Sequence, residues 1–157
     1  MKILVTGGAG FIASHVVDAF IEEGHDVVVL DNLITGNRDN LNPKAKFVEL
    51  DIRDKKVKEL FAQEKFDVVN HHAAQMDVRK SVEDPQFDAD VNVMGSLNLL
   101  EQCKKNNVKQ FMFSSTGGAI YGEQDYFPAD EKHPQRPLSP YGITKKKKKK
   151  YLFYYKE

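Results

Sequence analysis

Two residues near the end of the chain have the types and spacing that proton transfer requires. Tyr141 and Lys145 are four positions apart at the start of an expected helix, so their side chains share one helix face. Because a fixed ammonium favours the ionised form of a nearby phenol, we expect the pKa of Tyr141 to be lowered. Ser115 or Thr116, earlier in the chain, offers a hydroxyl that can hydrogen-bond a reacting oxygen. Together these residues predict an acid/base site, although a Tyr-x-x-x-Lys pair alone also arises by chance on surface helices.

The N-terminal stretch indicates what such a site would work with. Gly7, Gly8 and Gly10 follow a short apolar strand, and glycines allow both a sharp turn and close approach of a ligand to the backbone. The expected helix after them directs its free N–H groups and positive dipole end at the turn, which favours a pyrophosphate. Asp31 follows Gly10 by 21 positions, near the spacing at which a carboxylate meets the ribose hydroxyls of a dinucleotide. The pattern predicts dinucleotide binding; a tight turn in an unrelated α/β protein would explain the glycines but not Asp31.

Apolar runs and helical periodicity alternate along the whole chain. The expected strands and helices, in chain order, are strand 2–6, helix 11–23, strands 27–30 and 46–50, helix 54–63, strand 67–70, a helix from about 85 to 106, strand 110–113 and helix 141–157. Alternation of this kind predicts right-handed βαβ units and a parallel sheet. We therefore expect an α/β, Rossmann-like doubly wound sheet of strand order 3-2-1-4-5, forming one dinucleotide-binding domain over residues 1–157.

Polar or small residues follow three of the expected strands at the same edge of the sheet. Ligands in open α/β sheets bind at this carboxyl edge. Besides the glycine turn, Ala73 and Ala74 follow the fourth strand, and residues 114–116, Ser-Ser-Thr, follow the fifth. The two alanines either let a cofactor lie against the backbone or allow close packing of helix on sheet, and the sequence favours neither.

Composition excludes several classes of protein. The 157 residues are 41% hydrophobic and 29% charged, with a formal net charge of +0, so nothing global favours nucleic acid or an anionic membrane. Cys103 is the single cysteine, which permits no internal disulfide and reads as a small core residue. His71 and His72 have no cysteine or carboxylate beside them at ligand spacing, so we expect strand-end packing and no metal. Without a signal peptide or an apolar span, a soluble cytoplasmic protein is expected.

Residues 145–150 are six consecutive lysines inside the last expected helix. Like charges one helical turn apart repel, and the run covers every face of the helix, so a solvated face does not account for it. A patch for nucleic acid or membrane is one interpretation. We favour an engineered, truncated or imperfectly recorded segment.

Several motifs together resemble the extended short-chain dehydrogenase/reductase family, with the closest likeness to its UDP-glucose 4-epimerase branch. They occur in the family's order and spacing, and they are Thr-Gly-Gly-Ala-Gly-Phe-Ile at 6–12, Asp-Asn-Leu at 31–33, His-Ala-Ala-Gln at 72–75, Ser-Ser-Thr-Gly-Gly-Ala-Ile-Tyr-Gly at 114–122 and Ser-Pro-Tyr-Gly-Ile-Thr-Lys at 139–145. The resemblance implies tightly held NAD. Because Asp31 would repel a 2′-phosphate, NAD is expected in preference to NADP.

The resemblance also implies which residues hold the cofactor. They are Gly7, Gly10, Phe11 and Ile12 for the pyrophosphate, Asp31 and Asn32 for the adenosine ribose, Asp51 and Ile52 for adenine, Ala73, Ala74 and Asn92 along the path to the nicotinamide, Lys145 for the nicotinamide ribose, and Ser114 and Tyr141 as further contacts.

By the same resemblance the reaction is epimerisation of a UDP-hexose. Tyr141 removes the proton from the sugar 4-hydroxyl, a hydride passes from C4 to NAD, and the 4-keto sugar turns over and takes the hydride back on its other face. Thr116, or less favourably Ser115, steadies the 4-oxygen. Related dehydratases carry an Asp-Glu pair after the threonine, where Gly117 and Gly118 stand here, so elimination of water is disfavoured.

Members of the family are roughly twice as long and continue into a substrate domain. We therefore expect this chain to represent the N-terminal portion and to be inactive by itself. Two alternatives remain open, namely an NAD-binding module without turnover and a nucleotide-sugar dehydratase or reductase of the same family. The likeness implies homodimers through the two long helices, which the lysine run would oppose.

Overall fold

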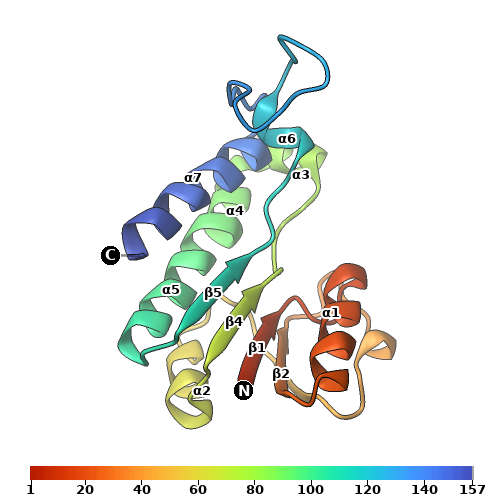
Figure 1. The fold of residues 1–157 in the computed structure, drawn as a ribbon, viewed down its shortest axis with the longest axis vertical. Helices are drawn as coiled ribbons and strands as arrows, with labels where there is room; N and C mark the ends of the chain where they lie inside the picture. The colour runs from red at the N-terminus through yellow and green to blue at the C-terminus, as the bar shows by residue number, and fades with distance from the viewer. Residues whose placement is uncertain (157) are drawn as a thin grey trace. The chain divides into compact units, whose positions relative to one another are not determined.

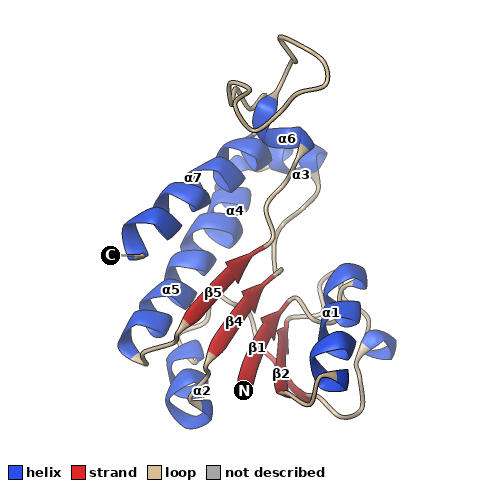
Figure 2. Cartoon of the chain, in the orientation of Figure 1, coloured by secondary structure: helices blue, strands red, loops and turns tan. Residues whose placement is uncertain are grey.

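The computed structural model describes residues 1–156, and the chain divides into two compact units. Unit 1 consists of Met1–Ala74 and Leu97–Ser114, and unit 2 of Gln75–Ser96 and Ser115–Glu157. Figure 1 follows the chain by residue number, and Figure 2 shows that every strand belongs to one sheet. Among the described residues, no helix is both long and apolar enough to cross a membrane.

Unit 1 is built on a five-stranded parallel sheet. The strands are β1 (Lys2–Thr6), β2 (Asp26–Asp31), β3 (Lys46–Glu49), β4 (Val68–His71) and β5 (Gln110–Phe113). Their order is β3-β2-β1-β4-β5, which confirms the predicted order. In the register, Thr6 at the end of β1 lies opposite Leu30 on one side and His71 on the other. The carboxyl ends of β1, β2 and β4 therefore come level at one edge of the sheet.

Helices flank this sheet because each crossover connection is right-handed. The connection through α1 (Phe11–Glu22) runs from β1 towards β2, whereas those through α2 (Val57–Glu64) and α5 (Gly95–Lys105) run in the opposite direction, which places them on the other face. Ala13 and Val17 of α1 pack with Ile3, Val5 and Val29. Leu60, Phe61 and Cys103, from α2 and α5, are buried as core residues, as the apolar spacing predicts.

Unit 2 contains helices that the sequence did not resolve. The helix expected from about 85 to 106 is present as three consecutive segments, α4 (Pro85–Ala89), the π-helical η2 (Asp90–Met94) and α5, most of which belongs to unit 1. The sequence did not predict the π-helical stretch within it. The sequence also did not predict α3 (Val78–Glu83), α6 (Gly118–Tyr121) and, in unit 1, the 3-10 turn η1 (Arg38–Asn40), because runs this short carry little periodicity.

The last helix, α7 (Pro140–Tyr155), begins as its sequence predicts. Pro140 occupies the first turn, where its missing N–H costs nothing. The Ser139 hydroxyl accepts a hydrogen bond from the Gly142 N–H at 3.1 Å. A Cβ at Gly142 would lie 2.3 Å from the Ala119 carbonyl oxygen, so this glycine allows the first turn of α7 to pack directly on α6.

Two lysines of the run are buried in unit 2. Lys145 is 4% exposed and Lys148 only 1%, whereas Lys147, Lys149 and Lys150 are exposed. Burial disfavours the charged form, and it lowers the pKa of Lys145 to about 8 and that of Lys148 well below the ordinary 10.5. The run therefore has two buried and four more accessible lysines on one helix. Because all six residues are identical, the sequence alone does not show which are buried.

Replacing Lys148 with Met should stabilise the protein. A methionine of similar length fills the same space without the desolvation of an amine, and such replacements of buried charged groups contribute about 1–4 kcal/mol. Lys148 binds a proton in the unfolded chain that it does not bind when buried in the folded chain. The free energy of unfolding of the natural chain should therefore rise between pH 7 and pH 10. This rise should be smaller in Lys148→Met.

Urea denaturation at both pH values measures this effect, with the exposed Lys147→Met as the matched control. The control should change stability little. A Lys148→Met variant that is less stable than the natural chain would contradict the burial cost.

Candidate functional site

The glycine turn after β1 is closed by direct contact with the end of β4. Gly7 has φ +72, and a Cβ built on it would lie 2.7 Å from the Ala73 backbone nitrogen. That nitrogen donates to the Thr6 carbonyl oxygen at 3.0 Å. Both the left-handed backbone and the close approach require glycine at this position. The backbone of Ala73 therefore lies directly against the turn.

The N-terminus of α1 is open to an anion. Gly10 is its N-cap residue in extended conformation, and within the described chain neither a capping side chain nor an acidic residue occupies the first turn. The first N–H groups of a helix otherwise need such partners, and they carry the positive end of the helix dipole. Phe11 and Ile12 are 78% and 66% exposed, so these side chains leave the helix end uncovered. The residues present fit a pyrophosphate.

Asp31 links the end of β2 to the glycine turn. Its Oδ2 accepts a hydrogen bond from the Ala9 N–H at 3.0 Å, and its Oδ1 accepts from the Leu33 N–H at 2.8 Å. A Cβ at Gly36 would come within 3.0 Å of Oδ1, so the loop after β2 also closes on this carboxylate. Asp31 is 7% exposed. A fixed negative charge thus stands beside the open end of α1, where the dinucleotide pattern placed it.

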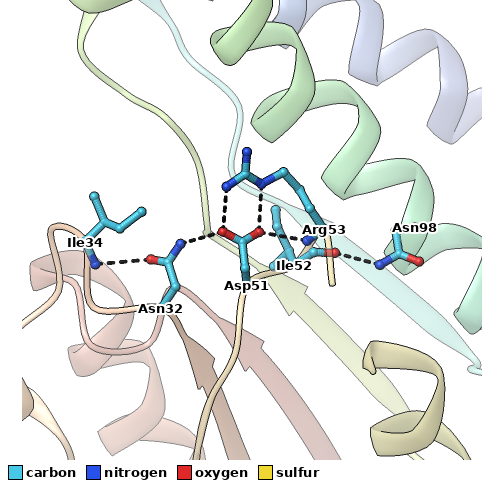
Figure 3. A network of polar contacts seen from close by, with 6 residues as sticks. All are labelled: Asn32, Ile34, Asp51, Ile52, Arg53 and Asn98. Carbon is cyan, nitrogen blue, oxygen red and sulfur yellow. Dashed lines mark hydrogen bonds and ion pairs between the residues drawn. The ribbon is translucent and has the colours of Figure 1, made fainter. Parts of the chain in front are cut away.

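A second polar network extends the site along the edge of unit 1 (Figure 3). Arg53 donates from Nε and NH2 to the two Asp51 oxygens, both at 2.9 Å, and the Asn32 amide donates to Asp51 Oδ2 at 2.8 Å. The hydrogen bonds from the Arg53 guanidinium are the main reason that the pKa of Asp51 falls to about 2. The backbone N–H of Arg53 and the side chain of Asn32 make smaller contributions in the same direction. Asn98 donates to the Ile52 carbonyl oxygen at 2.7 Å. Asn32, Asp51 and Ile52 are therefore held together, as expected of neighbours around one adenosine.

The end of β4 is also fixed by hydrogen bonds. Thr6 Oγ1 and His71 Nδ1 lie 2.7 Å apart, and the Ser114 N–H donates to the His71 carbonyl oxygen at 3.2 Å. His71 is 1% exposed, so it packs at the strand end as predicted. Over residues 1–156, no group of three His, Cys, Asp or Glu side chains could hold a metal ion.

Unit 2 brings Thr116, Tyr141 and Lys145 together. The Lys145 Nζ lies 5.6 Å from the centre of the Tyr141 ring, and the Thr116 and Tyr141 side chains share a hydrogen bond. The Tyr141 N–H donates to Ser81 Oγ at 3.2 Å, which fixes the start of α7. Ser115 is exposed, so Thr116 is the hydroxyl that accompanies the tyrosine.

The predicted direction of the Tyr141 pKa is wrong. Burial, the largest effect, raises this pKa above 10, the Thr116 hydrogen bond opposes it, and the negative charge of Asp88 adds to it. The prediction from sequence considered the ammonium of Lys145 but not the burial of the two side chains. The phenol is therefore protonated at neutral pH, and Lys145, with a pKa of about 8, is the group that titrates nearest to it.

Asn92 lies in the π-helical segment η2, where one widened turn directs it at the chain that follows β4. Its Oδ1 accepts from the Gln75 N–H at 3.1 Å, and its Nδ2 donates to the Gln75 carbonyl oxygen at 2.9 Å. Single π-helical turns of this kind occur frequently at functional sites. The family resemblance assigns Asn92 to the site, but the π-helical segment that carries it has no signal in the residue pattern.

Sequence reasoning missed Asp88 altogether. This carboxylate is fully buried and accepts hydrogen bonds from Gln75 Nε2 and Asn92 Nδ2, both at 3.0 Å, and from Thr144 Oγ1 at 2.8 Å. Four other residues within 84–92 carry acidic or amide side chains, so one more aspartate there is not conspicuous in the sequence. Only the fold shows that it faces α7.

Comparison with known proteins identifies a family and several similar structures. Residues 3–157 match the model of the NAD dependent epimerase/dehydratase family. The crystal structure of UDP-glucose 4-epimerase with UDP-glucose from Thermotoga maritima has a TM-score of 0.96 and 50% identity, over 99% of this chain and 51% of that chain. The Thermus thermophilus UDP-glucose 4-epimerase complex with NAD has a TM-score of 0.95 and 48% identity, over 99% of this chain and 50% of that chain.

A curated UDP-glucose 4-epimerase from Mycolicibacterium smegmatis is 42% identical over 161 residues, which cover 99% of this chain and 51% of that protein. The chain therefore spans about half the length of the relatives it matches.

Substituting Gly7 with Ala should destabilise unit 1 more than an alanine at Gly24. Both glycines have positive φ, +72 and +78, but a Cβ at Gly24 meets nothing within 4 Å. The left-handed backbone costs roughly 1–2 kcal/mol at either position. At Gly7 the clash with Ala73 adds to this cost. Denaturant midpoints of the two variants measure the difference, and equal losses would show that the turn and β4 do not need their close contact.

The Asp51–Arg53 pair should contribute stability that disappears in acid. The folded pKa of Asp51, about 2, lies below the ordinary 3.8, so the contribution is present above about pH 4 and is lost as the pH falls towards 2. At pH 7, Asp51→Asn should lower unfolding free energy by on the order of 1–2 kcal/mol, reduced by partial exposure.

A double-mutant cycle with Arg53→Gln, followed from pH 7 down to pH 3, isolates the pair. The coupling energy should shrink with the pH. A coupling that stays constant would exclude ionisation of Asp51 as its source.

Proposed function

Because the chain belongs to the NAD-dependent epimerase/dehydratase family, we propose that it is the NAD-binding part of a nucleotide-sugar epimerase of the UDP-glucose 4-epimerase type. The observation that carries the proposal is the uncapped N-terminus of α1 behind a glycine turn, with the Asp31 carboxylate fixed beside it. Backbone donors suit a pyrophosphate, and a carboxylate suits the paired hydroxyls of a ribose. Relatives crystallised with NAD and with UDP-glucose support the two ligand classes.

In this proposal the residues of unit 1 hold the adenosine and pyrophosphate portions. Gly7, Gly10, Phe11 and Ile12 surround the pyrophosphate. Asp31 and Asn32 bind the ribose, and Asp51 and Ile52 the adenine. Ala73, Ala74 and Ser114 line the path towards the nicotinamide. In unit 2 the proposal assigns Asn92 to the cofactor. The negative charge of Asp31 repels a 2′-phosphate, which makes NAD the preferred cofactor over NADP.

The chemistry belongs to Tyr141, Thr116 and Lys145. Bound NAD would supply the hydride acceptor at the sugar C4. Tyr141 takes the proton of the 4-hydroxyl in one direction and returns a proton to the 4-oxygen in the other. Thr116, which already hydrogen-bonds Tyr141, steadies that oxygen. Lys145, whose Nζ lies 5.6 Å from the centre of the Tyr141 ring, binds the nicotinamide ribose.

A second candidate is a dinucleotide-binding module without turnover. For this candidate the supporting observation is the uncapped N-terminus of α1, which suits an anion whether or not a sugar is turned over. A dehydratase or reductase of the same family is a third candidate, and Gly117-Gly118 after Thr116 argues against the dehydratase. Conversion of UDP-galactose to UDP-glucose by the purified chain with added NAD separates the first two candidates, and we expect binding with little or no turnover.

Calorimetric titration with NAD and NADP tests the cofactor site. We expect the natural chain to bind NAD more tightly than NADP, and Asp31→Asn to lose about 10–100-fold in NAD affinity, the range for a hydrogen bond to a charged group. Asp39→Asn, an exposed aspartate in η1, is the matched control and should bind as the natural chain does. A folded chain that gives no heat with saturating NAD would refute the proposal.

A further inference from the structure

The solvent-facing side of α7 concentrates positive charge. Lys147, Lys149 and Lys150 are exposed and Lys146 is half-buried, and in the part of the chain that the structure describes none of the four forms an ion pair. Like charges one helical turn apart destabilise a helix, and an anion bound among them relieves that repulsion. The formal charge of the whole chain is +0, so this excess is local to α7.

Three of these lysines line a hollow in unit 2. Lys146, Lys149 and Lys150 recur at intervals of three and four residues, so they share one face of α7, and Phe153 continues that face one turn later. Together with Gln135 from the preceding loop they line a hollow of about 410 Å³. The Lys146 ammonium donates a hydrogen bond to the Gln135 carbonyl oxygen. Because that acceptor is neutral, the positive charge of Lys146 stays uncompensated.

Phe153 adds an aromatic surface to this charged hollow. Its side chain is 71% exposed near the end of α7. Ammonium groups suit phosphates, and an exposed ring suits the stacking of a nucleobase. The seven residues from Lys146 to Phe153 cover about 10 Å of helix, so one short stretch of a nucleotide chain reaches both kinds of group.

We propose that this hollow binds single-stranded nucleic acid, with backbone phosphates at Lys146, Lys149 and Lys150 and one base stacked on Phe153. A cationic groove combined with an aromatic platform is typical of proteins that bind single strands without sequence preference. A hollow suits a narrow strand better than a flat anionic bilayer, and a duplex keeps the faces of its bases stacked inside. The inference does not rest on the proposed function, whose adenosine and pyrophosphate contacts lie in unit 1.

The experiment measures binding of a fluorescent oligothymidylate of about 10 nucleotides to the full chain by anisotropy, over a series of salt concentrations. Each phosphate neutralised on a single strand contributes about −0.7 to the slope of log K against log salt concentration. Three lysine–phosphate contacts therefore contribute about −2. In the triple variant Lys146→Gln, Lys149→Gln and Lys150→Gln, which keeps good helix formers, the slope should become shallower by about 2.

Lys55, Lys56 and Lys58 provide the matched control for charge. They are exposed around the start of α2, and they do not line the hollow. Changing these three to glutamine removes the same net charge, and the slope should stay near that of the natural chain.

The aromatic contact has its own pair of variants. Phe153→Ala should weaken binding about 5–150-fold, the range for one stacked base, and should leave the salt slope unchanged. Tyr154→Ala removes a neighbouring exposed ring that does not line the hollow, and it should bind as the natural chain does.

Equal loss of slope in the two triple lysine variants would overturn the proposal, because it would show general attraction to a cationic protein. Binding to phosphatidylserine vesicles without binding to the oligonucleotide would also overturn it and would assign this face of α7 to a membrane. Should the α7 triple variant fail to fold by circular dichroism, Phe153→Ala against Tyr154→Ala decides alone. The assay contains neither NAD nor a sugar nucleotide, so its outcome is independent of the proposed function.

Discussion

The close contact between the turn after β1 and the end of β4 is the constraint on which the candidate site depends. Where another residue would carry a Cβ, Gly7 leaves room for the Ala73 nitrogen, and the Thr6 carbonyl oxygen accepts the N–H groups of both His72 and Ala73. The chain can then turn into α1 without covering its first N–H groups. Asp31, the last residue of β2, accepts a hydrogen bond from the Ala9 N–H and so connects β2 to the turn. In a parallel sheet the carboxyl ends of these three strands lie at one edge. Because the residues there are small, the N-terminus of α1 stays uncovered and can accept an anion.

The two units handle charge in opposite ways. In unit 1, each of two carboxylates has a hydrogen-bonding partner directly beside it. Asp51 has Arg53 beside it, and the backbone satisfies Asp31. In unit 2, burial lowers the pKa of both Lys145 and Lys148, and the charge of Lys145 lowers that of Lys148 further. Displaced pKa values of this kind are typical of sites that transfer protons. Within residues 1–156 every buried polar side-chain atom has a hydrogen-bond partner, so the cost of burying these groups lies in their charge and not in missing hydrogen bonds.

Sequence reasoning was strongest where one residue type permits one conformation. The glycine turn follows from local chemistry and the strand order from the alternation of strands and helices, and the structure confirms both. It failed where tertiary burial decides. Six identical lysines gave no indication that Lys145 and Lys148 point inward. The Tyr141 pKa was predicted in the wrong direction for the same reason, since desolvation outweighs a nearby cation. The π-helical turn η2 was missed because its residues also fit an ordinary helix.

Burial of the Tyr141–Lys145 pair changes what the pair can do. An exposed ammonium at its ordinary pKa would remain charged throughout the neutral range. Its electrostatic effect on the phenol would therefore not change with pH in that range. Lys145, with a pKa of about 8, changes its charge within one unit or so of neutrality. Its effect on Tyr141 can therefore be switched by any charge that enters or leaves the same poorly screened space. A reaction that takes a proton and then returns it needs a phenol that is neither permanently ionised nor permanently neutral. Because burial raises the pKa of Tyr141, its phenol is protonated near neutral pH, and proton uptake by its oxygen requires additional positive charge in the same space.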